Sequence, residues 1–135
     1  MARQKKVVDA SIAVKWFSHE PGSKEALQLL EDHKNQLNTL VIPEFAFLEI
    51  LNALRFKHMD AALLHKINKD LWDLRLFLEP LTPSLLEMAI SIAIEYDLTV
   101  YDALYAAVCH VHHCPLETDD KRLSKAVNFL HAGIH

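Results

Sequence analysis

Four acidic residues stand at positions where carboxylates from separate elements could act together: Asp9, Glu49, Asp102 and Asp120. If they converge, their mutual repulsion calls for a hard cation, and all-oxygen sites suit Mg²⁺ or Mn²⁺. Such ions orient a water molecule, lower its pKa and neutralise charge on a reacting phosphate. The pattern therefore favours hydrolysis of a phosphate ester without a side-chain nucleophile.

Three of these acids also have a purely structural explanation as helix caps. Asp9 follows a short apolar run and precedes a predicted helix, which is a common place for an N-cap aspartate. Thr99 and Asp102 have the spacing of a capping pair. Asp119 and Asp120 both precede a predicted helix and either one could cap it. Taken singly, each of these acids is explained as well by capping as by chemistry.

Glu49 is harder to explain structurally. It lies in the middle of a predicted helix, residues 43–57, that is apolar almost all round and is therefore expected to be buried. A lone buried carboxylate costs free energy unless it has a partner. The alternative is that Glu49 lies at a solvated edge of the helix beside Asn52.

The elements that must position these acids alternate along the chain. Strands are predicted over residues 5–9, 37–42, 76–81 and 114–118, with a possible edge strand at 128–134. Helices are predicted over residues 10–17, 43–57, 84–96, 99–112 and 121–127, and two more begin at caps Ser23 and Asp60. Pro43 is assigned to the first helical position. This alternation predicts an α/β fold with a parallel sheet covered on both faces. Ligands bind such sheets beyond the carboxyl ends of the strands, where the acids are expected.

Length and composition fit one compact domain over residues 1–135. The hydrophobic fraction of 51% is enough for a core, and two cysteines suggest a reducing cytoplasm. No run approaches the roughly 18 apolar residues of a membrane span, so no membrane partner is expected. The net charge of −4 is unusual for a nucleic-acid binder. If the acids are neutralised by cations, the remaining surface is close to neutral and suits a partner that is bound briefly.

Four segments together resemble the PIN-domain family, and specifically the VapC-type toxins. The first runs from Val7 to Phe17, the third from Leu98 to Tyr105 and the fourth from Leu116 to Leu123. The second consists of Pro43, Glu49, Asn52 and Leu54. All four occur in the family's order and span nearly the whole chain.

The resemblance implies a three-layer α/β/α fold and a Mg²⁺- or Mn²⁺-dependent endoribonuclease acting on RNA. It also implies the toxin of a type II toxin–antitoxin pair, a small antitoxin that occupies the site, and a homodimer or higher homo-oligomer. By motif position, the metal-binding and catalytic acids are Asp9, Glu49, Asp102 and Asp120, supported by Ser11 and Thr118. Asp119 adds an acid beside the expected one. The spacing to Thr118 and Leu123 selects Asp120, and Asp119 is assigned a supporting role.

Other functions remain open from the sequence. The chain could be an RNA-processing PIN nuclease without an antitoxin, or a catalytically silent relative that only binds RNA. A receiver-like signalling module also has an acidic magnesium pocket, but it would place paired acids after the first strand, where this chain has Asp9 alone. The segment from Cys109 to Cys114 contains zinc-ligand types at a spacing that matches no usual zinc site, so both cysteines are interpreted as small buried residues.

Overall fold

A four-stranded parallel sheet forms the centre of the protein in the computed structural model, which describes residues 3–132. The strands are β1 (Gln4–Val8), β2 (Asn38–Pro43), β3 (Phe77–Glu79) and β4 (Leu116–Glu117). Their order across the sheet is β3-β2-β1-β4, and every neighbouring pair is parallel. All carboxyl ends therefore meet at one edge of the sheet.

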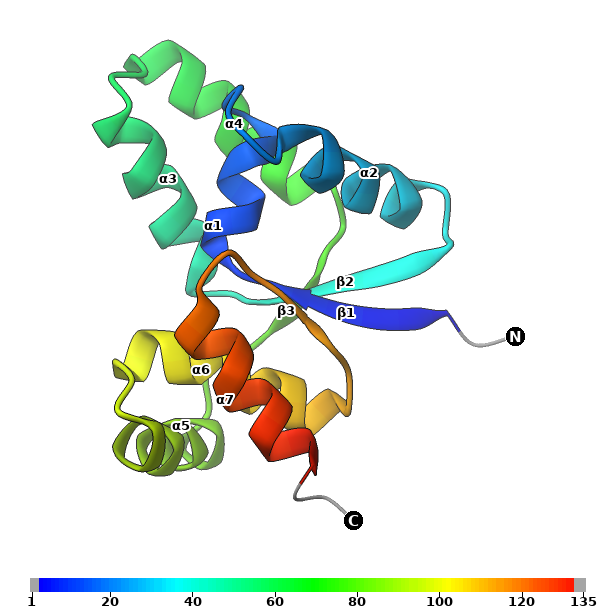
Figure 1. Cartoon of the computed structure of the whole chain (residues 1–135). Coiled ribbons are helices and arrows are strands. Elements are labelled where there is room, and N and C mark those ends of the chain that lie inside the picture. The colour runs from blue at the N-terminus through cyan, green and yellow to red at the C-terminus, as the bar shows by residue number, and fades with distance from the viewer. Residues whose placement is uncertain (1–2, 133–135) are drawn as a thin grey trace.

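Helices cover both faces of this sheet (Figure 1). One face carries α1 (Ala10–Ala13), the 3-10 helix η1 (Val14–Trp16), α2 (Ser23–Lys34), α3 (Ala46–Phe56) and α4 (Ala61–Asp73). The other carries α5 (Pro83–Tyr96), α6 (Val100–His112) and α7 (Lys121–Ala132). The predicted three-layer α/β/α architecture is confirmed. Within residues 3–132, no helix combines the length and the apolar character needed to cross a membrane.

The carboxyl-terminal parts of the two central strands are buried on both faces. Val7 and Val8 in β1 and the run Leu40–Ile42 in β2 are fully inaccessible to solvent. Each such side chain stabilises the fold by about 1.5–3 kcal/mol through removal of apolar surface from water. Because these strands are packed from both sides, the position of the backbone at their carboxyl ends is well defined. The positions of the residues that directly follow are therefore well defined too.

Two predicted helix caps are confirmed. The Asp60 carboxylate accepts a hydrogen bond of 2.9 Å from the Leu63 amide at the start of α4. The Thr99 hydroxyl accepts one of 3.0 Å from the Asp102 amide at the start of α6. These bonds satisfy amide groups that have no partner within the helix.

The predicted helical start at Pro43 is wrong. Pro43 is buried as the last residue of β2, where it pairs with Glu79 of β3, and α3 begins only at Ala46. The ladder continues past the proline, because the Glu44 amide donates to the Glu79 carbonyl at 3.0 Å. A fixed φ near −65° is compatible with the end of a strand as well as with the first turn of a helix.

The prediction that Ser23 caps α2 is wrong. Gly22 is the N-cap, at a φ of 90° that favours glycine, and Ser23 is the first helical residue. The Ser23 hydroxyl instead accepts from the Glu20 amide at 3.0 Å and donates to the Ser18 carbonyl at 2.9 Å. The serine therefore fixes the preceding turn.

The possible edge strand at 128–134 is also wrong where it can be compared, because residues 128–132 continue α7. Residues 133 and 134 of that prediction lie outside the described part of the chain. The apolar side chains that α7 turns to the core, Leu123, Ala126, Val127 and Leu130, follow a helical spacing of three and four residues. That period extends the helix beyond the predicted end at Val127.

Candidate active site

Asp9 lies where β1 and β4 end side by side. The register pairs Val8 with Glu117, so the next residues, Asp9 and Thr118, face each other across the edge of the sheet. The Asp9 amide donates to the Glu117 carbonyl at 3.2 Å. Its carboxylate accepts from the Ile12 amide at 3.2 Å and caps α1. The predicted role of Asp9 as a helix N-cap is confirmed. Its side chain also lies at the carboxyl edge of the sheet, where ligands bind parallel sheets.

Two hydroxyl groups hold the buried Asp9 carboxylate. Ser11 donates to one oxygen at 2.6 Å, and Thr118 donates to the other. Burial raises the pKa of Asp9 above its ordinary value, while these two hydrogen bonds act in the opposite direction. Ser11 and Thr118, the residues expected to support the acids, therefore both contact Asp9 and fix the direction of its carboxylate.

Glu49 lies in α3 at the same edge, partly buried. Its carboxylate accepts a hydrogen bond of 2.6 Å from the phenol of Tyr105 on α6. Burial raises the pKa of Glu49, the Tyr105 bond opposes this, and the nearby charges of Asp102 and Asp9 raise it further. Glu49 is therefore not an exposed edge residue beside Asn52. It belongs to the set of candidate acids Asp9, Glu49, Asp102 and Asp120, which we call the acidic group, and its partner Tyr105 comes from another helix.

Asp102 extends the group towards α7. Its amide is capped by Thr99, so the backbone half of the predicted capping pair is present. Burial raises the pKa of the Asp102 carboxyl group, and the charge of Asp120 adds to this, while Thr99 and Arg122 lower it. Asp102 thus lies within electrostatic range of both Glu49 and Asp120 and links them.

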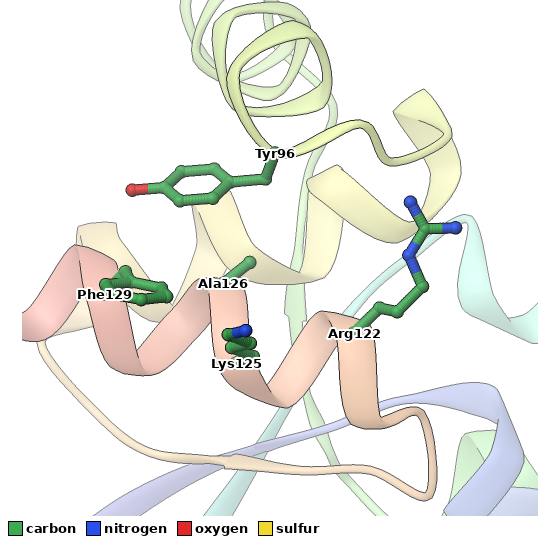
Figure 2. A pocket seen from close by; sticks show the side chains of 5 residues that line it. All are labelled: Tyr96, Arg122, Lys125, Ala126 and Phe129. Carbon is green, nitrogen blue, oxygen red and sulfur yellow. The ribbon is translucent and has the colours of Figure 1, made fainter.

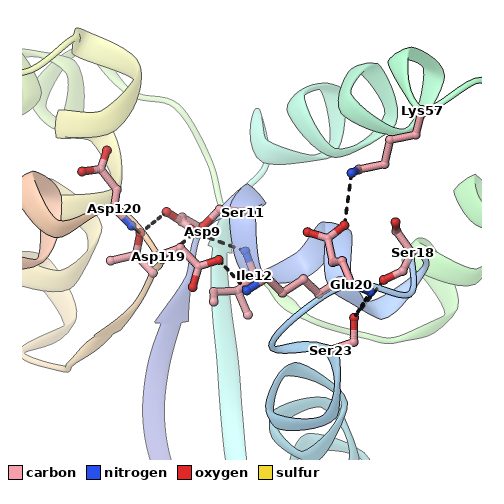
Figure 3. Close-up of polar contacts among 11 residues, drawn as sticks. Asp9, Ser11, Ile12, Ser18, Glu20, Ser23, Lys57, Asp119 and Asp120 are labelled. Atoms are coloured by element: carbon pink, nitrogen blue, oxygen red, sulfur yellow. Dashed lines mark hydrogen bonds and ion pairs between the residues drawn. The ribbon is translucent and has the colours of Figure 1, made fainter.

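Asp119 and Asp120 point to different surroundings (Figure 3). One Asp120 oxygen accepts from the Arg122 and Leu123 amides at 2.9 and 3.2 Å, which caps α7. The Asp119 carboxylate instead forms an ion pair of 2.5 Å with the buried Lys15. Of the two, it is Asp120 that acts on the pKa of Asp102. The geometry favours Asp120 as the member of the acidic group.

A shallow pocket opens beside the acids on the α6–α7 side. Its volume is about 270 Å³. It is lined by Asp97, Leu98, Thr99, Asp102, Asp120 and Arg122. The Arg122 guanidinium is held by the carbonyl and carboxylate of Asp97 at 2.6 and 3.2 Å. The pocket therefore combines two acids of the group with a fixed cation.

Comparison with known proteins assigns the family. The family model of the PIN domain matches residues 6–128, which is most of the chain. The chain belongs to the PIN-domain family. The fold is similar to the crystal structure of PAE2754 from Pyrobaculum aerophilum, with a TM-score of 0.69 and 24% sequence identity over 96% of this chain and 88% of that one. Among functionally curated proteins, none matches the chain.

PIN domains are in general metal-dependent nucleases, and the donors of this PIN domain suit a divalent cation. The four acids Asp9, Glu49, Asp102 and Asp120 offer only oxygen, which Mg²⁺ and Mn²⁺ prefer. Three of them have a pKa raised by burial, and neighbouring carboxylates raise it further for Glu49 and Asp102. In the described part of the chain, no three His, Cys, Asp or Glu side chains are close enough to enclose an ion in this conformation. Cation binding would therefore draw these side chains together.

Three further residues contact the candidate acids or line their pocket, and the sequence did not identify them as site residues. Tyr105 holds Glu49, Lys15 holds Asp119, and Arg122 lines the pocket. Tyr105 stands three residues after Asp102, so both share one face of α6, and this spacing was a usable signal. Lys15 and Asp119 are separated by about a hundred residues and no local pattern connects them.

The two cysteines are not part of the site. Cys109 and Cys114 are free thiols, and both are buried. Their interpretation as small core residues is confirmed.

Proposed function

We propose that residues 1–135 form one PIN nuclease domain that hydrolyses RNA as a divalent-metal-dependent endoribonuclease. The observation that supports this most strongly is a series of four acids from four elements, each within electrostatic range of the next, near the carboxyl edge of the sheet. Electrostatic effects connect Asp9 to Glu49, Glu49 to Asp102, and Asp102 to Asp120. A protein gains nothing in stability from such mutual repulsion, and a cation shared by these groups would relieve it.

Some of the side chains would bind the cation, and others orient the carboxylates that bind it. Asp9, Glu49, Asp102 and Asp120 would hold Mg²⁺ or Mn²⁺, which when bound supplies charge neutralisation at a phosphate and a lowered pKa of water. The hydroxyls of Ser11 and Thr118 keep the Asp9 carboxylate in one orientation. Tyr105 does the same for Glu49. Asp119, bound to Lys15, holds the loop before α7 against the first helix, since its amide donates to Ser11 at 3.3 Å.

Metal dependence tests this function directly. Purified protein with 5′-labelled single-stranded RNA should give internal cleavage products in Mn²⁺ or Mg²⁺, and excess chelator should stop the reaction. Restoring the cation should restore cleavage. Equal cleavage rates with and without chelator would contradict the proposal, and the absence of any cleavage with either cation would favour a silent RNA-binding relative.

We further propose that the enzyme is the toxin of an antitoxin pair. Exposed apolar side chains on α3 and α4 offer a surface for a small protein partner: Leu48, Leu63 and Trp72. Leu48 is 63% exposed and directly precedes Glu49, so a partner bound there reaches the acids and can occupy the site.

The partner is sought in the adjacent short reading frame. Its product, co-purified with this chain, should abolish RNA cleavage, and Leu48→Glu should release the activity. A gene without such a neighbour, or a neighbour whose product leaves cleavage unchanged, would favour an RNA-processing nuclease instead.

A further inference from the structure

A second hollow lies along α7, between this helix and the end of α5 (Figure 2). Its volume is about 280 Å³. It is lined by Tyr96, at the end of α5, and by Arg122, Lys125, Ala126 and Phe129 of α7. We call this hollow the aromatic pocket. It contains no acidic side chain, in contrast to the adjoining pocket, so its chemistry differs from that of the metal site.

The aromatic pocket offers ring faces to solvent. The rings of Tyr96 and Phe129 are nearly parallel, with centroids 6.4 Å apart and planes inclined by 20°. Phe129 is 56% exposed, although an aromatic side chain of this size gains stability by burial. The Lys125 ammonium lies 5.9 Å from the centroid of the Phe129 ring. A flat, electron-rich ligand with an anion attached would find both a stacking surface and a cation here.

The aromatic pocket borders the acid-lined pocket, because Arg122 lines both. The helix begins beside Asp120, and Phe129 follows nine residues later, which is about 13 Å along the axis. A single strand covers that length with about four stacked nucleotides at 3.4 Å each, or fewer when extended. The two pockets therefore lie within reach of one short oligonucleotide.

We infer that the aromatic pocket binds a nucleobase of the single-stranded RNA a few nucleotides from the cleaved phosphate, a conclusion that rests on the proposed ribonuclease function. The base stacks on Phe129 and Tyr96, and Lys125 contacts an adjoining phosphate. Base–aromatic stacking tolerates any base, since every base has a π face. The pocket thus determines where the strand lies rather than which sequence is cleaved.

Arg122 completes the connection between the pockets. Its contacts to Asp97 use part of its five N–H donors and keep the guanidinium at the boundary. The Asp97 carboxylate is fully exposed and balances part of this charge. The net attraction for phosphate in the aromatic pocket accordingly depends on Lys125.

The test measures binding of a fluorescent single-stranded RNA dodecamer in Mn²⁺, in an Asp9→Asn background that prevents cleavage. Phe129→Ala should weaken binding about 5- to 150-fold, the range found when a stacking aromatic is removed. Phe129→Trp should retain binding. Phe129→Leu keeps apolar volume without a ring and should lose binding like alanine, which separates stacking from any loss of stability.

A matched control exists on α3. Phe56 is 67% exposed, and the Arg55 guanidinium lies 5.4 Å from its ring centroid, so this pair has the same chemistry far from α7. Phe56→Ala should leave RNA affinity unchanged. Lys125→Gln should lower the slope of log affinity against log salt by about 0.7, as expected for one phosphate contact on a single strand.

Dodecamers with one abasic position locate the base. At one position, removal of the base should weaken binding to the parent protein, which retains Phe129. The same abasic RNA should bind Phe129→Ala no more weakly than intact RNA does, because the two changes remove one and the same interaction. RNA bound equally by Phe129→Ala, Phe129→Leu and their parent would overturn the pocket assignment and leave the ribonuclease proposal intact. A wild-type chain that neither binds nor cleaves RNA would overturn both.

Discussion

Asp9 serves two purposes at once, since it caps α1 and lies at the base of the acidic group. Asparagine is as good an N-cap as aspartate, so Asp9→Asn should remain folded, while loss of the negative ligand should reduce RNA cleavage at least about 100-fold. Asp60→Asn is the matched control, because Asp60 caps α4 in the same way. That variant should keep full activity. Circular dichroism and cleavage rates check both, and an active Asp9→Asn protein would remove Asp9 from the chemistry.

The raised pKa values of Asp9, Glu49 and Asp102 make the metal-free protein sensitive to pH. Each carboxyl group binds its proton more tightly in the folded state than in the unfolded state. As pH rises from the ordinary values of 3.8 for Asp and 4.5 for Glu through the raised folded values, the folded state loses stability. In chelator, these three groups should therefore make the protein melt at a lower temperature at pH 7 than at pH 4.

The variant Asp102→Asn isolates that contribution from the nine histidines. In chelator at pH 7 it should melt higher than wild type, because one repelling charge is gone, and Mn²⁺ should stabilise it less. If Asp102 acted only as a first-turn acid of α6, the substitution would instead cost roughly 0.3–1 kcal/mol. A lower melting temperature with an unchanged Mn²⁺ effect would contradict the role of Asp102 in the site.

At the scale of elements, the Tyr105–Glu49 hydrogen bond joins α6 to α3 across the site. Removing a partner that orients a metal ligand typically costs about 10- to 100-fold in activity or metal affinity, and we expect this from Tyr105→Phe. Since the bond lowers the pKa of Glu49, its loss should also move the acidic limb of the pH–rate profile to higher pH. A merely structural contact would leave that limb in place.

Tyr101→Phe is the control for this prediction on the same helix. The Tyr101 side chain is 58% exposed and stacks on Phe45 with ring centroids 5.3 Å apart, so it resembles Tyr105 in type but not in contacts. Loss of its hydroxyl should change neither the rate nor the pH profile.

At the scale of the whole molecule, α5 presents an apolar stripe with a spacing of four residues: Leu86, Ile90 and Ile94 are 37%, 51% and 82% exposed. A stripe on one helix can pair with its own copy about a two-fold axis. We predict a homodimer through α5, with light scattering giving about twice 15.4 kDa at micromolar protein.

Ile94→Glu should shift that mass to the monomer, because it places two like charges in the interface. Because the Ile94 side chain is exposed, the substitution should leave the fold unaffected. Leu48→Glu, on the α3 surface, should leave the mass unchanged. A monomer from Leu48→Glu together with a dimer from Ile94→Glu would instead place the interface on α3.

The sequence by itself determined the layers, the parallel sheet and the acids that follow its strands, because period, capping and strand ends are local properties. Asp60 and Thr99 were recognised as caps for that reason. Local signals failed at Pro43, whose fixed φ suits a strand end as well as a first helical turn, and at 128–132, where core packing extends α7.

Only the tertiary structure decided which side chains meet. Glu49 and Tyr105 are 56 positions apart, and Asp9 and Thr118 are 109 apart. Asp119 and Asp120 have different contacts because Lys15, from the first helical segment, forms an ion pair with Asp119. Phe129 gains its ring neighbour only because α5 ends beside α7. Such contacts depend on the packing of elements against a common core, and no period or cap in the sequence encodes the distance between residues that far apart in the chain.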